Sequence, residues 1–423
     1  MNLILFLILF NYIKPIILPL TAQKTIDDLN ETKSSDIFHN LNFYYYIYLY
    51  IGKERKKQSY ILDTGSIITS SPCNLCKHCG KHQNGFYEIN KKNILKCKDK
   101  KCSLVKNKCK KKKTKCKFSI KYVEGSSING IYINELIRFN YNDIPFEFPI
   151  GCTINETNSF KNQLPDGVLG IKYSKKSFIS NLYKLKIIKY NLFTLCFSNN
   201  GGYFSIGEIV YKSHLNDDIS YIKLKNKSIN ILSIIINDKV INVNKRRKKK
   251  YKAIIDSGST YSSFPISIAK KCFKIIKKIC NKKKNKGKCG KNSYDKSFGE
   301  CFEFDNINDM YYAIDNIFPN IIFNFENDIN FVWESRNYYI DIFKNVICLG
   351  FIGLKNKFVL GINFIKGYNF IFNIKKSKIG FIKSNCDYFE KKIINKIEMT
   401  KIKVKIIMNK MINEIIKEIK NDL

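Results

Sequence analysis

One segment of this chain occurs twice. Residues 59–72 read SYILDTGSIITSSP and residues 252–265 read KAIIDSGSTYSSFP. Each copy places apolar residues before an aspartate, a Thr/Ser-Gly-Ser tripeptide after it, and a proline nine residues beyond it. Each copy is also followed, at a similar distance, by an apolar-apolar-glycine segment that ends at Gly170 or Gly361. The chain therefore consists of two related halves, and Asp63 of the first half has a counterpart, Asp256, in the second.

An aspartate at the end of an apolar strand is costly to bury unless it is hydrogen-bonded or paired. If Asp63 and Asp256 lie close together, both carboxyl groups cannot ionise easily, so the pair shares one proton and titrates as a unit. The ionised member then takes a proton from water while the protonated member hydrogen-bonds a peptide carbonyl. The repeat thus predicts a pair of aspartates that is able to act as general acid and general base.

Three residues follow each aspartate and are expected to shape its loop. They are Thr64, Gly65 and Ser66 in the first half, and Ser257, Gly258 and Ser259 in the second. We expect the first hydroxyl of each trio to bond across the junction between the halves. We expect the glycine to let the backbone turn sharply, and the last serine to donate a hydrogen bond to the outer carboxylate oxygen.

The rest of the chain reads as mostly β. Short β-branched and aromatic runs alternate with turn residues, from FYYYIYLYIG at 43–52 to NFIFNIKKSKIGFI at 369–382. The clearest helix is predicted at 265–280, where a proline opens an amphipathic stretch. With 423 residues, of which 44% are hydrophobic, the chain is long enough for two lobes that each have a core.

The two aspartate loops resemble those of pepsin-like aspartic proteases, and the resemblance extends over nearly the whole chain. It implies a bilobal, mostly-β fold with the active-site cleft between the lobes, protein or peptide substrates, and no cofactor. The segment 122–136, YVEGSSINGIYINEL, resembles the hairpin flap that covers the substrate in these enzymes. Tyr122 would be the flap tyrosine, and Gly125 would permit the hairpin. A non-catalytic binding protein of the same fold is an alternative, but such relatives typically lose an acid that this chain keeps.

Fifteen cysteines indicate an oxidising compartment. The cluster CNLCKHC at 73–79 also has zinc-ligand spacing, with His78 and His82 close by, so a zinc site remains an alternative. The stronger resemblance is to the cysteine-rich insert of nepenthesin-like aspartic proteases, which implies disulfides and no metal. The disulfide candidates are Cys73, Cys76, Cys79, Cys97, Cys102, Cys109 and Cys116 in the insert, and the pair Cys301 and Cys348, which resembles a bridge of the wider family. Fifteen cysteines allow seven bridges with one left over.

Within this group, the chain most resembles the branch that resides in the endoplasmic reticulum of apicomplexan parasites. That resemblance implies processing of secretory or exported proteins at an Arg-x-Leu type motif. Glu124 matches the flap acid implicated in holding the substrate arginine, since a carboxylate and a guanidinium form a charge-assisted pair. Gln163 matches a second contact to that arginine. A general secretory or digestive protease without this specificity is the alternative.

The expected organisation has five parts. They are a signal peptide at 1–22, a short prosegment or linker at 23–40, an N-terminal lobe at 41–215 with the insert at 73–116, a C-terminal lobe at 216–387, and a basic amphipathic tail at 388–423. The tail is able to contact a membrane surface, but it contains no apolar run of transmembrane length. We therefore expect a lumenal monomer of the endoplasmic reticulum. The net charge of +39 follows the abundance of lysine, and no nucleic-acid-binding motif accompanies it, so we expect no nucleic-acid partner.

Overall fold

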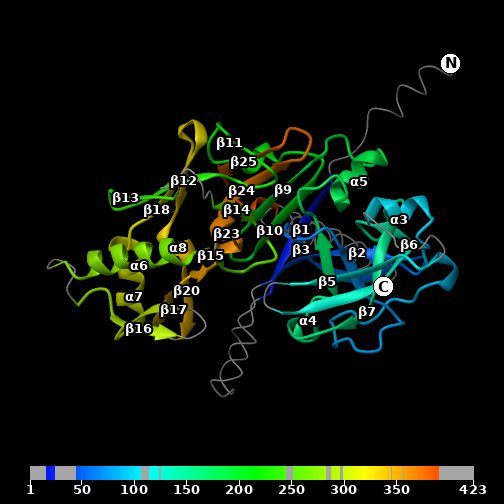
Figure 1. Cartoon of the computed structure of the whole chain (residues 1–423), viewed down its shortest axis with the longest axis horizontal. Coiled ribbons are helices and arrows are strands. Elements are labelled where there is room, and N and C mark those ends of the chain that lie inside the picture. Colours follow the sequence, from blue (N-terminus) through cyan, green and yellow to red (C-terminus); the bar gives the residue numbers. More distant parts are fainter. Residues whose placement is uncertain are drawn as a thin grey trace, which may run out of the picture.

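The computed structural model describes residues 16–23, 44–105, 114–122, 125–243, 251–282, 287–295, 299–343, 345–355 and 357–389. Two lobes lie side by side and are joined by a central set of strands (Figure 1). The N-terminal lobe, blue to green in Figure 1, lies on one side, and the yellow C-terminal lobe lies on the other. The predicted mostly-β, two-lobed architecture is confirmed.

Within the described residues, the largest sheet has 13 strands and runs from one lobe into the other. Its junction half consists of β11 (Ser220–Lys223), β25 (Lys378–Lys383), β24 (Tyr368–Asn373), β9 (Leu192–Phe197), β10 (Gly201–Ile206) and β1 (Ile16–Gln23), in that order. Its second half consists of β2 (Tyr44–Ile51), β3 (Lys56–Asp63), β8 (Gly167–Gly170), β4 (Thr69–Pro72), β7 (Phe146–Glu156), β6 (Ser127–Arg138) and β5 (Lys117–Lys121).

The C-terminal lobe adds three sheets of four strands each among the described residues. One contains β13 (Lys239–Asn242), β12 (Ile231–Ile236), β18 (Ile321–Phe325) and β19 (Asn330–Trp333). The next contains β14 (Lys252–Ile255), β23 (Lys357–Leu360), β15 (Ser262–Pro265) and β22 (Phe351–Leu354). The third contains β16 (Lys291–Asp295), β17 (Gly299–Glu303), β21 (Val346–Leu349) and β20 (Tyr339–Phe343).

Helices are short and lie at the edges of the sheets. The α-helices are α3 (Lys100–Val105), α4 (Ser159–Asn162), α5 (Phe178–Lys184), α6 (Ile266–Cys280), α7 (Ile307–Asn316), α8 (Ser335–Tyr338) and α9 (Ile362–Ile365). The described residues also include the 3-10 turns η1 (Lys91–Asn93), η2 (Tyr211–Ser213) and η4 (Glu326–Asp328). The longest, α6, agrees with the helix predicted at 265–280. It buries Ile268, Cys272 and Ile276, four residues apart on one face, and packs against β15 and β22.

Each lobe has an apolar interior that holds the strands beneath the aspartate loops in place. In the first lobe, Ile47 and Leu49 of β2 and Leu62 of β3 are almost fully buried. In the second, Trp333 is fully buried and its ring packs near that of Phe264 in β15. Because closely packed interiors resist displacement, both loops rest on rigid supports.

The first described strand, β1, lies inside the predicted signal peptide. It pairs antiparallel with β10, from Ile16 opposite Ile206 to Thr21 opposite Gly201, and its end pairs with β2. A leader that ended at residue 22 would take this strand away and leave unpaired backbone on both neighbours. We therefore expect any leader to end before Ile16.

Six disulfides join described cysteines. They are Cys73–Cys152, Cys76–Cys79, Cys102–Cys116, Cys196–Cys386, Cys280–Cys289 and Cys301–Cys348. Cys97 is also disulfide-bonded, and Cys272 is a buried free thiol. The prediction of a disulfide-rich chain with a Cys301–Cys348 bridge is thus confirmed. Because Cys73, Cys76 and Cys79 are all bonded to other cysteines, they present no thiolates for the alternative zinc site.

Several predicted features lie outside the described residues. They are Glu124, Cys109, most of the prosegment at 23–40, and the tail beyond residue 389. Among the helices that are described, none has the length and apolar character needed to cross a membrane.

Candidate active site

Both aspartates stand where a strand ends beside a parallel neighbour. β3 runs parallel to β8 and places Asp63 opposite Gly170. In the second lobe, β14 runs parallel to β23 and places Ile255 opposite Leu360, so that Asp256 follows directly. The backbone N–H of Ile171 donates to the Asp63 carbonyl, and that of Asp256 donates to the Leu360 carbonyl. The downstream apolar-glycine segments found in the sequence are therefore the parallel partners that support the aspartate loops.

The two loops are joined by reciprocal hydrogen bonds. The Thr64 N–H donates to the Ser257 hydroxyl at 3.1 Å, and the Ser257 N–H donates to the Thr64 hydroxyl at 2.9 Å. Each hydroxyl in turn donates to a carbonyl across the junction, Thr64 to Ile255 at 2.9 Å and Ser257 to Leu62 at 2.7 Å. All four bonds are buried, so each loop fixes the position of the other.

The two carboxyl groups lie against each other. The carboxyl groups of Asp63 and Asp256 are close enough to interact. A Cβ atom on Gly65 would lie 2.7 Å from both Asp256 carboxylate oxygens, and one on Gly258 would lie 2.9 Å from Asp63 Oδ1. Neither glycine has a positive φ. Both glycines lie in the turn that follows their aspartate, as the sequence predicts, and the structure adds that each is needed for the close approach of the facing carboxylate.

The two aspartates have different surroundings. Asp63 is 2% exposed, and its Oδ1 accepts the backbone N–H groups of Gly65 at 2.6 Å and Ser66 at 3.1 Å. Asp256 Oδ1 accepts the Gly258 N–H at 3.0 Å. Burial and the charge of Asp63 nevertheless raise the pKa of Asp256 well above its ordinary value. The arrangement therefore favours the proton of the pair on Asp256.

The two serines that end the tripeptides differ. The Ser259 side chain lies close enough to Asp256 to lower the pKa of that carboxyl. Ser66 instead donates its backbone N–H to Asp63. Its buried hydroxyl makes no hydrogen bond with the described residues. The hydroxyl lies close enough to Tyr122 to affect the titration of that phenol. The expected donation from the Ser66 hydroxyl to Asp63 is therefore wrong in this conformation, because the hydroxyl faces the flap.

The predicted flap tyrosine lies over the aspartate pair. Tyr122 follows β5, which pairs with β6 as a hairpin, and the Tyr122 N–H donates to the Ser126 carbonyl at 2.8 Å. Gly125, with a φ of 102°, occupies the turn. The Tyr122 hydroxyl donates to Asp63 Oδ2 at 3.4 Å, and its ring contacts that of Phe160. Burial and the adjacent Asp63 charge raise the pKa of Tyr122 well above its ordinary value, so the phenol remains a hydrogen-bond donor.

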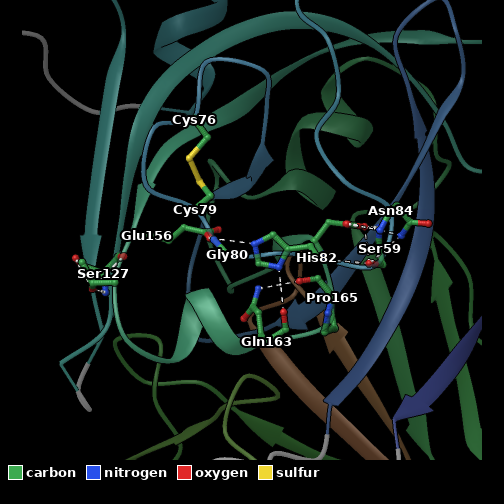
Figure 2. Close-up of polar contacts among 12 residues, drawn as sticks. Ser59, Cys76, Cys79, Gly80, His82, Asn84, Ser127, Glu156, Gln163 and Pro165 are labelled. Atoms are coloured by element: carbon green, nitrogen blue, oxygen red, sulfur yellow. Dashed lines mark hydrogen bonds and ion pairs between the residues drawn. A yellow bond between two sulfur atoms is a disulfide. The ribbon is translucent and has the colours of Figure 1, made fainter.

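Gln163 belongs to a buried polar cluster beside the insert (Figure 2). Gln163 is 5% exposed, and its side-chain amide donates to the Pro165 carbonyl at 3.1 Å. The backbone carbonyl of Gln163 lies 3.0 Å from His82 Nδ1. The structure thus gives Gln163 one partner in its own loop and one in the insert, whereas the sequence predicts a contact to a substrate arginine.

The centre of the same cluster is an ion pair that the sequence did not indicate. His82 Nε2 lies 3.0 Å from Glu156 Oε2, and the two side chains are 0% and 2% exposed. Glu156 Oε2 also accepts the Gly80 N–H at 3.0 Å, next to the Cys76–Cys79 disulfide (Figure 2). Burial opposes the charged imidazole, but the hydrogen bond and charge of Glu156 outweigh burial and raise the pKa of His82. The pair joins the insert to the end of β7.

A second buried acid supports β3. Asp166 is 0% exposed and accepts the N–H and hydroxyl of Ser59 at 2.7 Å each, and the N–H of Asn84 at 2.9 Å. It precedes β8, the parallel partner of β3. In the sequence, Asp166 was indicated only by its place in the DGVLGI segment. That segment was compared between the two halves because of its glycine. Asp166 therefore anchors the strand pair on which Asp63 stands.

Comparisons with known proteins agree with this geometry. Two protein-family models match, one described as "Xylanase inhibitor N-terminal" over residues 45–208 and one as "Xylanase inhibitor C-terminal" over residues 221–383. Plasmepsin V from Plasmodium falciparum is 27% identical over 81% of this chain and 71% of its own length. Aspartic protease 5 from Toxoplasma gondii is 25% identical over 39% of this chain and 19% of its own. Aspartic proteinase-like protein 1 from Arabidopsis thaliana is 21% identical over 88% of this chain and 71% of its own.

Proposed function

Because this chain belongs to the pepsin-like aspartic proteases, we propose that Asp63 and Asp256 are its catalytic pair and that it cleaves proteins of the secretory pathway. The matches to plasmepsin V and to the two family models confirm the resemblance predicted from the sequence. The observation that carries the proposal is the close approach of the two aspartate loops, in which Gly65 lies against the Asp256 carboxylate and Gly258 against that of Asp63, and which reciprocal hydrogen bonds hold together.

The different surroundings of the two aspartates assign a role to each. Asp63 receives two backbone N–H groups and acts as the base that takes a proton from the attacking water. Asp256, with its raised pKa, carries the proton and hydrogen-bonds the scissile carbonyl oxygen. The water oxygen forms a bond to the carbonyl carbon, the C–N bond breaks, and the leaving nitrogen receives the proton held by the pair. The flap residue Tyr122 covers the pair and orders the substrate above it.

We propose peptides with an Arg-x-Leu type motif as the substrate class. The support is the similarity to plasmepsin V and the flap sequence YVEG, which places Glu124 two residues after Tyr122. A flap carboxylate suits an arginine because the pair is charge-assisted. The same similarity, together with the dense disulfides, supports a site of action in the secretory pathway, for which we propose the lumen of the endoplasmic reticulum.

The test is cleavage of a matched set of peptides by the purified protein. We expect cleavage of a peptide that carries Arg-x-Leu, and loss of cleavage on Asp63→Asn or Asp256→Asn. Asp218→Asn, at an exposed aspartate, is the control and should keep wild-type activity. Activity that survives Asp63→Asn would contradict the catalytic assignment.

The same assay distinguishes the proposed function from two alternatives. Equal cleavage when the substrate arginine is replaced by alanine would indicate a general secretory protease. The descriptions of the two family models name a xylanase inhibitor, so a binding protein of this fold is the other alternative. The retention of both aspartates favours the enzyme, and a wild-type protein that binds the peptides without cleaving them would favour the binding protein.

A further inference from the structure

A lysine lies beneath the first catalytic loop and has no equivalent in the second. Lys172 follows β8 by two residues, and its ammonium donates to the Gly65 carbonyl at 2.9 Å. Its backbone N–H also donates to the Ser66 carbonyl at 2.9 Å. Lys172 is therefore attached to the Asp63 loop by both its backbone and its side chain.

The lysine acts on Asp63 through one peptide group. The carbonyl of Gly65 and the N–H of Ser66 belong to the same peptide unit, and that N–H donates to Asp63 Oδ1 at 3.1 Å. A cation on the oxygen of a peptide draws electron density from its nitrogen, so the N–H becomes a stronger donor. The ammonium thus strengthens a hydrogen bond that only the ionised form of Asp63 uses fully.

The surroundings of Lys172 increase the effect of its charge on the Gly65–Ser66 peptide. Lys172 lines a small cavity below the loops together with the apolar side chains of Leu224, Ile229 and Phe372. An apolar environment screens a charge less than water does, so the field of the ammonium reaches the loop. The other cation at this cavity is Lys227, which is exposed. From the cleft side, the titratable groups that face Asp63 are Asp256 and Tyr122.

The second lobe has a neutral residue at the position that corresponds to Lys172. The alignment of Gly170 with Gly361 places Asn363 at the position equivalent to Lys172. The Asn363 amide is neutral and donates to the Gly350 carbonyl, while its oxygen accepts the Ser262 hydroxyl. The two halves therefore differ in charge where they support the two aspartates.

We propose that Lys172 is a positioning residue for the reaction, whose ammonium polarises the Gly65–Ser66 peptide, keeps Asp63 in its ionised form and leaves the proton of the pair on Asp256. The inference rests on the proposed function of the pair and adds a cause for its asymmetry. Lys172 contacts the Asp63 loop from the side that faces away from the cleft, so the role proposed for it requires no contact with the substrate.

The test is the pH dependence of kcat/KM for Lys172→Gln and Lys172→Arg. Glutamine keeps a donor without the charge, and we expect the acidic limb of the profile to move up by about 1 pH unit. Arginine keeps the charge and should leave that limb near its wild-type position. Lys227→Met removes a neighbouring cation that is not bonded to the loop, and serves as the control. If Lys172→Gln keeps the wild-type acidic limb, the inference is wrong, even if kcat falls.

A second measurement does not depend on catalysis. The change in Tm caused by Lys172→Gln is compared in the wild-type and Asp63→Asn backgrounds between pH 3 and pH 7, a range that spans the ordinary carboxyl titration of about 4. We expect the loss of Tm near pH 7 to be larger with Asp63 present, and the two backgrounds to converge at low pH. Equal losses at every pH would overturn the inference. A wild-type protein that cleaves nothing would contradict the proposed function and leave this comparison decisive for Lys172.

Discussion

Thr64 and Ser257 each accept a hydrogen bond from the backbone N–H of the other, across 193 residues of sequence. Each hydroxyl also donates to a carbonyl of the opposite lobe. These contacts lie directly beneath the two catalytic carboxyl groups. The distance between the carboxyl groups, and hence their ability to share a proton, depends on this pair of hydroxyl residues.

Thr64→Val should lower both stability and activity. Valine keeps the shape of threonine but leaves the buried Ser257 N–H and Ile255 carbonyl without a partner, which costs about 2–4 kcal/mol in unfolding free energy. We expect kcat to fall at least 10-fold because the loops separate. Thr194→Val is a matched control, since the buried Thr194 hydroxyl makes no hydrogen bond with the described residues. Urea unfolding of both variants provides the comparison, and equal losses would contradict the role of Thr64.

The pH profile should reflect the raised pKa of Asp256. Catalysis needs Asp256 protonated, and burial beside Asp63 holds that proton to a higher pH than for an ordinary aspartate. We therefore expect kcat/KM to stay high well above pH 4 and to fall as the pH rises through the raised pKa. The same shift contributes stability that is present below the ordinary carboxyl pKa and is lost as the pH rises through the raised one. A basic limb centred near pH 4 would contradict this prediction.

The His82–Glu156 pair should stabilise the insert in a pH-dependent way. Removal of one partner of a buried ion pair costs about 3–5 kcal/mol, so His82→Leu should strongly lower the free energy of unfolding. Because the pKa of His82 is raised, its contribution is fully present below about pH 6.5 and is lost as the pH rises through the raised value. The gap in Tm between wild type and His82→Leu should narrow between pH 6 and pH 9, a range around the ordinary histidine pKa of about 6.5. His78→Leu, at an exposed histidine, should show no such gap.

The disulfides should differ in their contribution to stability according to the length of chain that they close. Cys196–Cys386 closes 190 residues and Cys76–Cys79 closes 3. Loop-closure entropy predicts about 5 kcal/mol for the first and about 2 kcal/mol for the second. We expect the double serine variant of Cys196 and Cys386 to lose far more Tm than the double variant of Cys76 and Cys79. The opposite order in calorimetry would show that local packing outweighs chain entropy.

The mature N-terminus should precede Ile16. β1 forms a ladder with β10 and contacts β2, so its removal would expose backbone groups on both. Mass spectrometry of the secreted or lumenal protein would locate the terminus. As a structural control, a chain that begins at residue 24 should have a lower Tm than one that begins at residue 14. A mature protein that begins at residue 23 or later and keeps full stability would contradict this expectation.

Much of the candidate site could be predicted from the sequence because the two halves of the chain repeat one pattern. The two aspartate loops could be compared with each other, and the hydroxyl of Thr64 facing that of Ser257 followed from their equivalent positions. The flap tyrosine Tyr122 was similarly visible in its glycine-rich context. Each of these depends on a short run of neighbouring residues, which a linear pattern records directly.

Other features depend on contacts between segments far apart in sequence, and these only the tertiary structure decided. The close approach that requires Gly65 became visible only once Asp256 was placed against it. His82 and Glu156 come together over 74 residues, and Lys172 reaches the Gly65 carbonyl over 107. The sequence alone determined which two acids form the pair, because their loops repeat. Which acid keeps the proton depends on burial and backbone donors and, in our proposal, on Lys172, and only packing in three dimensions brings these together.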